Sequence, residues 1–248
     1  MNRKELRRYV GITGFSLGQV EKDYLQHIVL GALSRRLGGI LVFKGGTALQ
    51  KTGLLKRFSE DLDFTLVGDV SLDSLRDAVT GALETYNFAA DVDNLVDDER
   101  TLGFRLTIQG PLFRDRRSIC TIRIEASRRE EVSLPPRSTE IDPPYYDILP
   151  YVVEVMNLEE IAAEKIRAIY TRDRARDLYD LYRLTANGVR LREDLASEKL
   201  RFYDTKFDKG EFLRRCADVS KRWREELESL LESVPSADEV LKTVADAI

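Results

Sequence analysis

Apolar residues recur at helical spacing in the first part of the chain. They lie three or four positions apart, at Val20, Tyr24, Leu25, Ile28, Val29 and Leu33. This spacing predicts helical structure over residues 1–39, ending at Gly38 and Gly39. A second stripe predicts a helix that follows Ser71 as its N-cap and runs to about Tyr86, with inward-facing Leu72, Leu75, Val79 and Leu83.

Strand-like patterns fill most of residues 40–126. Residues 40–43 are a short apolar run, which is typical of a buried strand. Residues 61–66 alternate between polar and apolar side chains. Glycines and charged turns separate three further alternating segments, at 88–92, 102–108 and 119–126, which predict an antiparallel meander.

The pattern changes after residue 128. Prolines at several positions of 129–150 exclude a continuous helix or a central strand, so we expect an extended connector there, followed by a short strand at 151–155. Asn157 with Glu160 resembles a capping box that opens a helix over 158–170. We expect helices from there to the end, with two or three in residues 190–248. The predicted fold is α/β, a small mixed sheet flanked by helices, followed by a mainly helical C-terminal region.

Composition narrows the class of protein. Of the 248 residues, 43% are hydrophobic and 33% are charged, which describes a soluble globular chain. Neither a membrane-length apolar stretch nor a signal-peptide core is present, and Cys120 and Cys216 are too isolated for a disulfide framework, so we expect a cytoplasmic protein. A net charge of −4 argues against nucleic-acid coating by bulk charge but leaves room for a local basic groove.

A double glycine follows the first predicted strand. Gly45 and Gly46 end the apolar run, and Thr47 stands where an N-cap would open a short helix at Ala48. Main-chain N–H groups and a hydroxyl together suit an anion such as a triphosphate. By itself, such a double glycine is usually only a turn.

Two acids follow a few residues later. Strand alternation places Asp61 and Asp63 on one face and Leu62 and Phe64 on the other. Two carboxylates one strand step apart can hold Mg²⁺ together with substrate phosphates. The phosphate turn and the paired acids together favour a nucleotide–metal site over a structural turn beside a solvated acidic edge.

Two more acids and a lysine are candidates for the same site. If the polar face of 119–126 lies beside the paired acids, Glu125 becomes a third carboxylate; otherwise it is an ordinary solvated glutamate. Lys165 falls within an apolar helical stripe, where its ammonium would need a partner or would reach the solvent along the edge of the core. In the next helix Asp177 flanks the inner stripe, whereas Asp180 points nearly opposite.

These motifs resemble a known family. K-G-G-T-A-L at 44–49 with R-F-S-E-D-L-D-F at 57–64, and R-D-L-Y-D-L at 176–181, are similar to the AbiEii/AbiGii toxin family of the DNA-polymerase-beta-like nucleotidyltransferase superfamily. The resemblance covers residues 20–186. It implies that Gly46 and Thr47, with the adjoining Gly45, bind phosphate and that Asp61 and Asp63 bind metal. It also implies that Glu125 is a further metal ligand, which helps to activate the attacking hydroxyl, and that Lys165 and Asp177 are active-site residues.

The resemblance implies a reaction and its partners. We expect transfer of an NMP from ATP, GTP, CTP or UTP to an acceptor hydroxyl with Mg²⁺ or Mn²⁺, in a type IV toxin acting on a tRNA 3′ end, with an AbiEi-like antitoxin as partner. Lys165 and Arg57 would neutralise the triphosphate, although Arg57 and Ser59 suit orientation of the acidic strand better. Residues 1–155 would form the nucleotidyltransferase core, and residues 156–248 a helical domain that completes the cleft.

Two other functions remain open on the sequence. The chain could be a nucleotidyltransferase that modifies a protein or a small molecule such as an antibiotic. It could also be a catalytically silent NTP-binding module that works through protein contacts. The intact pair of acids argues against the silent module.

Overall fold

The computed structural model describes residues 1–231 and 233–248. Contacts between Cα atoms divide the chain into two compact units. Unit 1 comprises Met1–Ala48, Ser59–Val132 and Pro136–Val155, and unit 2 comprises Leu49–Phe58, Ser133–Pro135 and Met156–Ile248. Two short segments from earlier in the chain, Leu49–Phe58 and Ser133–Pro135, therefore pack with the C-terminal helices.

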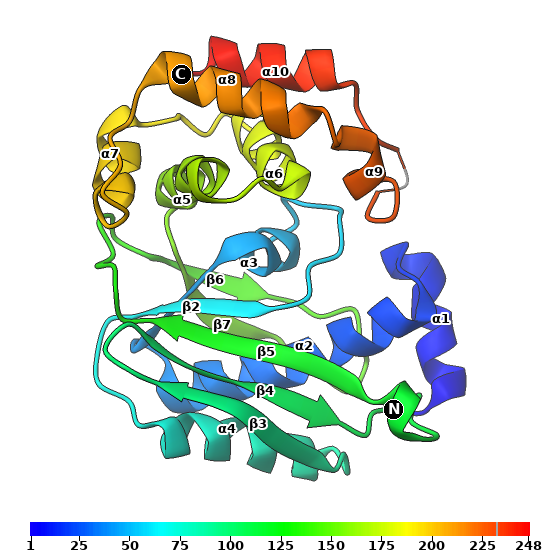
Figure 1. The fold of residues 1–248 in the computed structure, drawn as a ribbon. Coiled ribbons are helices and arrows are strands. Elements are labelled where there is room, and N and C mark those ends of the chain that lie inside the picture. The colour runs from blue at the N-terminus through cyan, green and yellow to red at the C-terminus, as the bar shows by residue number, and fades with distance from the viewer. Residues whose placement is uncertain (232) are drawn as a thin grey trace. The chain divides into compact units, whose positions relative to one another are not determined.

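Unit 1 is built on one seven-stranded mixed sheet with the order β3-β4-β5-β2-β1-β7-β6 (Figure 1). Its strands are β1 (Leu41–Lys44), β2 (Leu62–Leu66), β3 (Ala90–Asp97), β4 (Thr101–Ile108), β5 (Cys120–Ser127), β6 (Arg137–Ile141) and β7 (Tyr151–Val155). The β3–β4–β5 meander is antiparallel, as predicted. The pairs β2–β5 and β1–β7 are parallel, so the sheet is mixed at its centre.

Helices cover the apolar face of this sheet. Helices α2 (Leu17–Leu37) and α4 (Leu72–Thr85) contact each other, α2 contacts β5 and β7, and α4 contacts β3. The predicted helical stretch 1–39 is divided, because Gly14 adopts a left-handed conformation at the end of α1 (Arg3–Thr13) and Ser16 caps α2. A 3₁₀ turn, η1 (Arg116–Ser118), precedes β5.

The extended connector expected over 129–150 contains a strand at the edge of the sheet. Residues 137–141 form β6, which pairs antiparallel with β7 at the edge of the sheet. The prolines of this segment lie outside the paired residues, so no ladder hydrogen bond is lost. An edge strand therefore fits between two proline pairs.

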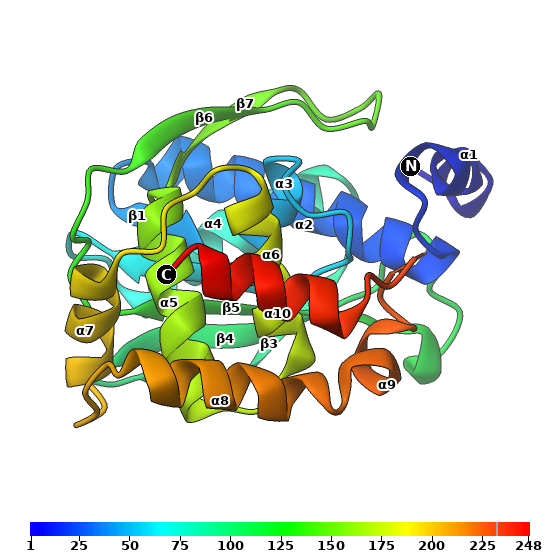
Figure 2. The ribbon, with the colours of Figure 1, turned by 90° about the horizontal axis from the view of Figure 1, so that it is seen from above.

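Unit 2 is helical. It contains α5 (Leu158–Thr171), α6 (Ala175–Ala186), α7 (Glu193–Arg201), α8 (Lys209–Ser220), α9 (Trp223–Leu227) and α10 (Ala237–Asp246). Helix α5 contacts α6, α7 and α8, and α10 lies beside α8 (Figure 2). The described part of 190–248 thus holds four helices rather than two or three. Across the described chain, no helix has the length and apolar character that crossing a bilayer requires.

The predicted capping box of α5 does not form. The Asn157 side chain accepts a hydrogen bond from the main-chain N–H of Glu159. Glu160 is fully buried and accepts hydrogen bonds from the N–H groups of Ser133 and Leu134 and from Lys199 Nζ. Glu160 therefore joins segment 133–135 to the helices of unit 2 instead of capping its own helix.

Candidate active site

The glycine turn lies against the second acid. Gly45 follows β1 with φ +76°, and a Cβ atom placed on it would lie 2.8 Å from Asp63 Oδ2. The strand register explains this approach, because Lys44 of β1 is the Cα partner of Asp63 in β2. Glycine is required here for its backbone conformation and for the space that it leaves to the carboxylate.

Thr47 has a different role from the predicted N-cap. Helix α3 (Gly45–Lys51) begins at Gly45 rather than at Ala48, so Thr47 lies inside its first turn. The Thr47 hydroxyl is buried and donates a hydrogen bond to the main-chain carbonyl of Asp61. This bond fastens the glycine turn to the chain just before β2, and it brings Thr47 directly to the first acid.

Three carboxylates meet on one face of the sheet. Asp63 in β2 and Glu125 in β5 are Cα partners on parallel strands, and Asp61 immediately precedes β2. Phe64, the neighbour of Asp63, lines the apolar cavity beneath α2 and so faces the other way. The predicted convergence of the three acids therefore follows from the register of β2 and β5.

Arg123 lies between two of these acids. Its Nη1 is 3.3 Å from Glu125 Oε2, and its Nη2 is 3.8 Å from Asp61 Oδ2. The three side chains are each about half exposed, at 56% for Arg123, 41% for Glu125 and 42% for Asp61. The guanidinium thus shields the two outer carboxylates from one another at a solvent-accessible position.

The inner acid is electrostatically different. Burial, and then the negative charges of Asp61 and Glu125, raise the pKa of Asp63 to about 6, against the opposing effect of Arg123 and Lys44. Near neutral pH, the negative charge of Asp63 is therefore held at an energetic cost, which a bound cation would reduce.

The donor set suits a hard divalent cation. All the ligand atoms that the cluster offers are carboxylate oxygens, which Mg²⁺ and Mn²⁺ prefer. Among the described residues, however, no three or more His, Cys, Asp or Glu side chains already have the arrangement that holds a metal ion. The chemistry of the three acids fits a metal, and two of them, Asp61 and Glu125, contact Arg123.

The segment leading to the acids is fixed from α2. The Gln26 side-chain amide donates to the carbonyl oxygens of Ser59 (3.0 Å) and Glu60 (2.8 Å). Lys22 pairs with the Glu60 carboxylate at 2.8 Å. Ser59 therefore contributes its main chain to the placement of Asp61, a role in orientation.

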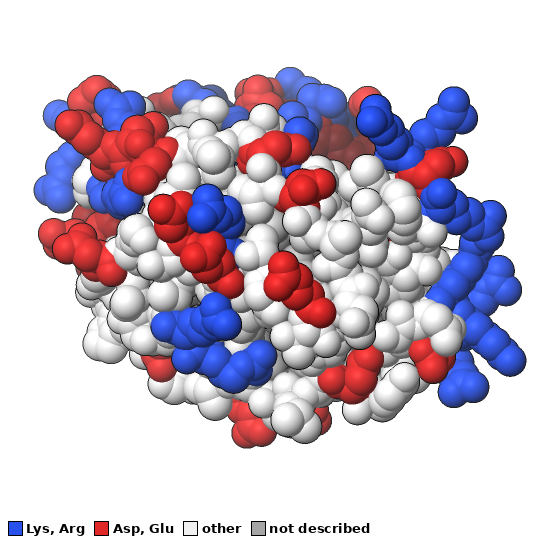
Figure 3. Space-filling view, turned by 90° about the horizontal axis from the view of Figure 1, so that it is seen from below, with Lys and Arg blue, Asp and Glu red and all other residues white. Residues whose placement is uncertain are grey.

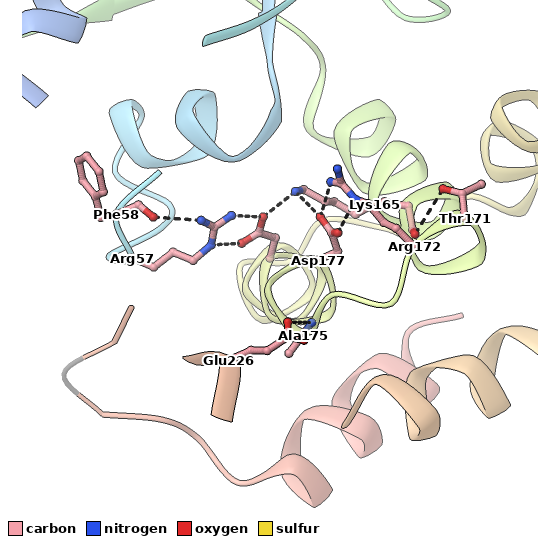
Figure 4. Close-up of polar contacts among 10 residues, drawn as sticks. Arg57, Phe58, Lys165, Thr171, Arg172, Ala175, Asp177 and Glu226 are labelled. Carbon is pink, nitrogen blue, oxygen red and sulfur yellow. Dashed lines mark hydrogen bonds and ion pairs between the residues drawn. The ribbon is translucent and has the colours of Figure 1, made fainter. Parts of the chain in front are cut away.

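A second polar cluster lies within unit 2 (Figure 4). Lys165 Nζ is 2.9 Å from Asp177 Oδ1 and 2.6 Å from Asp180 Oδ2. Arg57 holds both oxygens of Asp180 at 2.6 Å, and Arg172 contacts Asp177 at 2.8 and 3.0 Å. Cations and carboxylates thus alternate along a chain of five side chains.

This cluster corrects the interpretation of Asp180. Asp180 does not point away from the packed side of α6, because it is fully buried and contacts both Arg57 and Lys165. The burial of Asp180 could not be predicted from its position in the helix, because the segment that covers it, Leu49–Phe58, lies far away in sequence. The signal available in the sequence was Arg57 itself, whose partner could not be foreseen.

Charge pairing outweighs burial in this cluster. Burial would raise the pKa of Asp177, but Lys165 and Arg172 hold it well below its usual range. Burial likewise opposes the charge of Lys165, yet Asp180 and Asp177 raise the pKa of its ammonium. Asp177 and Lys165 therefore both stay charged at neutral pH.

In the comparisons with known proteins, a family model identifies the family, and solved structures share the fold. The family model described as "Nucleotidyl transferase AbiEii toxin, Type IV TA system" matches residues 28–246. No curated protein matches the chain significantly. Among solved structures, a putative nucleotidyltransferase from H. pylori is 21% identical with a TM-score of 0.61, covering 94% of both chains.

Two further solved structures share the fold. JHP933 from Helicobacter pylori is 20% identical with a TM-score of 0.58, covering 94% of this chain and 91% of its own. The nucleotidyltransferase toxin MenT4, Rv2826c from Mycobacterium tuberculosis H37Rv, is 20% identical with a TM-score of 0.62, covering 100% of this chain and 88% of its own. At this level of identity, these likenesses establish the fold alone.

Proposed function

Because the chain belongs to the AbiEii nucleotidyltransferase toxin family of type IV toxin–antitoxin systems, we propose that it moves an NMP from an NTP to an acceptor hydroxyl in a metal-dependent reaction. The observation that supports this most strongly is the meeting of Asp61, Asp63 and Glu125 on one sheet face beside Gly45. Family membership also implies an antitoxin partner, AbiEi-like in our proposal.

Each acid of the unit 1 cluster has a proposed role in the reaction. Asp61, Asp63 and Glu125 would hold Mg²⁺ or Mn²⁺ through their carboxylates, and Glu125 would also help to take up the proton of the acceptor hydroxyl. The metal, when bound, supplies charge neutralisation at the phosphates and activation of the hydroxyl. The acceptor oxygen bonds to the α-phosphorus while the bond to the β-phosphate oxygen breaks, which releases pyrophosphate.

The glycine turn provides the phosphate contacts in this proposal. The main chain at Gly45 approaches the Asp63 carboxylate closely. Phosphates bound to a metal ion on that carboxylate would therefore lie next to the N–H groups of Gly45 and Gly46. The hydroxyl of Thr47 is engaged with the Asp61 carbonyl. Thr47 therefore supports the turn through that bond and reaches phosphate through its own main chain.

The unit 2 cluster has a proposed part that rests on the family resemblance. Lys165 and Asp177 are candidate active-site residues, and Lys165 is the cation that would neutralise a triphosphate. Arg57 gives both its Nε and Nη2 donors to Asp180 and its Nη1 donor to the Phe58 carbonyl. This favours a positioning role for Arg57 over direct phosphate contact.

The proposed acceptor is RNA, with a tRNA 3′ end as the specific case. Two elements of unit 1 favour a polyanion over a small neutral acceptor, the helix α1 and the turn before β5. Their exposed basic residues are Lys4, Arg7, Arg8, Arg114, Arg116 and Arg117. Figure 3 shows Lys and Arg gathered along the margin of the surface on which α1 lies. Such clusters bind phosphate backbones, and an RNA acceptor implies a cytoplasmic site of action.

A label-transfer assay tests the proposal. Each of the four NTPs, labelled at the α-phosphate, is incubated with the protein, Mg²⁺ and total RNA, protein or metabolites. We expect label in RNA, and none with Asp63→Asn. Label in protein or in a small molecule would establish the rival acceptors. Growth inhibition that survives Asp61→Ala plus Asp63→Ala would establish the silent binding module.

A further inference from the structure

Arg123 is the one cation that contacts two members of the acid cluster directly among the described ion pairs of unit 1. It reaches Glu125 at 3.3 Å and Asp61 at 3.8 Å. The longer of these separations exceeds hydrogen-bond range, so the guanidinium is held by charge more than by directed bonds. Its side chain is 56% exposed. It is therefore placed to leave when a competing cation arrives.

The strand register explains why Arg123 turns toward the acids. Thr121, Arg123 and Glu125 alternate on the polar face of β5, and Leu62 is the Cα partner of Ile124, so Arg123 stands level with the start of β2. Its Cα partner on the other side is Arg105. Arg105 is already paired with Asp93 through two hydrogen bonds of 2.7 and 3.2 Å. Asp61 and Glu125 are thus the carboxylates left for Arg123.

The ion pairs of Arg123 are weak enough to be exchanged. Half-exposed pairs contribute little net free energy, because water screens the attraction. A divalent cation bound between Asp61, Asp63 and Glu125 would lie within a few ångströms of the same guanidinium, where like charges repel. Metal and Arg123 therefore cannot both occupy the cluster without cost.

We propose that Arg123 is the resident counter-ion of the Asp61–Asp63–Glu125 cluster, which competes with a divalent metal and is released to nucleotide phosphate when metal and NTP bind together. This inference rests on the proposed nucleotidyl transfer and adds a coupling between its two ligands. A guanidinium pairs with phosphate oxygens through two parallel N–H donors. Nucleotide phosphate thus replaces, as the ion-pair partner of Arg123, the carboxylates that bind the metal.

The coupling has a direct consequence for binding. Metal alone must displace Arg123 into water, whereas metal with NTP transfers it to a new anion. Each ligand should therefore raise the affinity for the other, by the same factor in both directions. The uncharged variant Arg123→Gln removes both the competition and the compensation.

The test is Mn²⁺ titration of the full chain, followed by electron paramagnetic resonance, with and without a non-hydrolysable NTP analogue. We expect Arg123→Gln to bind Mn²⁺ alone about tenfold more tightly than the wild type, from the loss of one positive charge about 4 Å from a dication. The factor by which the analogue improves Mn²⁺ affinity should fall by a similar amount. Arg123→Lys keeps the charge and should stay within about twofold of the wild type.

A matched control separates local from general charge effects. Arg105→Gln makes the same charge change at the neighbouring Cα position, where the guanidinium is paired with Asp93. We expect its Mn²⁺ affinity to stay within about twofold of the wild type. Should Arg123→Gln melt at a lower temperature, Arg123→Met keeps the aliphatic stem and gives the same test.

The outcomes distinguish this inference from the proposed function. If the wild type binds Mn²⁺ with the analogue but Arg123→Gln binds Mn²⁺ alone no more tightly, the competition is wrong and nucleotidyl transfer stands. Equal tightening by Arg105→Gln would also overturn it, since the effect would then be one of net charge. If the wild type takes up no Mn²⁺ even with the analogue, the proposed metal-dependent function fails, and the inference fails with it.

Discussion

Asp63 and Glu125 are Cα partners on adjacent parallel strands of unit 1, with their side chains on the polar face of the sheet. Two acids in this register lie side by side, since paired residues on parallel strands point to the same face of the sheet. Burial, and then the negative charges of Asp61 and Glu125, raise the pKa of Asp63 to about 6. The strand register therefore gathers carboxylates that a nearby cation stabilises, and Arg123 provides part of this stabilisation through Asp61 and Glu125.

The first prediction concerns Asp63 and pH. Because its pKa is raised from 3.8 to about 6 in the folded chain, its contribution to stability is fully present below 3.8 and is lost as pH rises through 6. Without metal, Asp63→Asn should therefore gain about 1–3 kcal/mol of unfolding free energy relative to the wild type between pH 4 and pH 7.5. Urea denaturation in a chelator at both pH values measures this gain.

The control for this prediction is Asp69→Asn. Asp69 is an exposed acid of the same unit. Its substitution should change stability by less than about 0.5 kcal/mol, equally at both pH values. If the stability difference between the wild type and Asp63→Asn does not change with pH, the raised pKa assigned to Asp63 is contradicted.

The second prediction concerns the space beside Gly45. Gly45→Ala introduces a Cβ 2.8 Å from Asp63 Oδ2 at φ +76°. We expect a loss of about 2–3 kcal/mol, from backbone strain and displacement of the carboxylate together, and at least about a tenfold fall in label transfer. Gly39→Ala meets no atom within 4 Å at φ +83°. It should cost only the strain, about 1 kcal/mol, with activity retained; equal effects at both glycines would contradict a special role for Gly45.

Much of unit 1 was predictable because its signals are local. Alternation over 61–66 and 119–126 put Asp63 and Glu125 on polar faces, and only one strand pairing then had to be inferred. The start of α3 at Gly45 was not predictable. A left-handed glycine can belong to a turn or to a helix start, and only the buried bond from Thr47 to Asp61 decides between them.

Unit 2 was less predictable because its polar contacts are not local. A helical wheel of α6 ranks Asp177 and Asp180 by the apolar stripe of that helix alone. Arg57 lies more than a hundred residues earlier, and its pairing with Asp180 buries a carboxylate that the wheel assigns to solvent. The roles of Lys165 and Asp177 in catalysis stay predictions, since the structure shows their pairing and not their chemistry.

The third prediction concerns the Thr47 hydroxyl. Thr47→Val keeps the shape but leaves the Asp61 carbonyl without its donor, so we expect a loss of about 1–2 kcal/mol and reduced label transfer. Thr47→Ser keeps the donor and should transfer label within about threefold of the wild type. Thr80→Val removes a hydroxyl that bonds within α4, and its activity should be unchanged. Full activity of Thr47→Val would show that the placement of Asp61 does not depend on this bond.

The last prediction concerns Asp180, which holds Arg57 and Lys165 in unit 2. Asp180→Asn leaves two buried cations short of a carboxylate, so unfolding free energy should fall by about 3–5 kcal/mol in urea denaturation. Asp194→Asn breaks the exposed pair with Arg192 and should leave the unfolding free energy nearly unchanged. Arg57→Met combined with Asp180→Asn should cost clearly less than the sum of the two single changes, because the double variant no longer buries the Arg57 charge. Simple additivity of the two changes would mean that Arg57 and Asp180 do not stabilise one another, and that the buried chain of charges is not a unit.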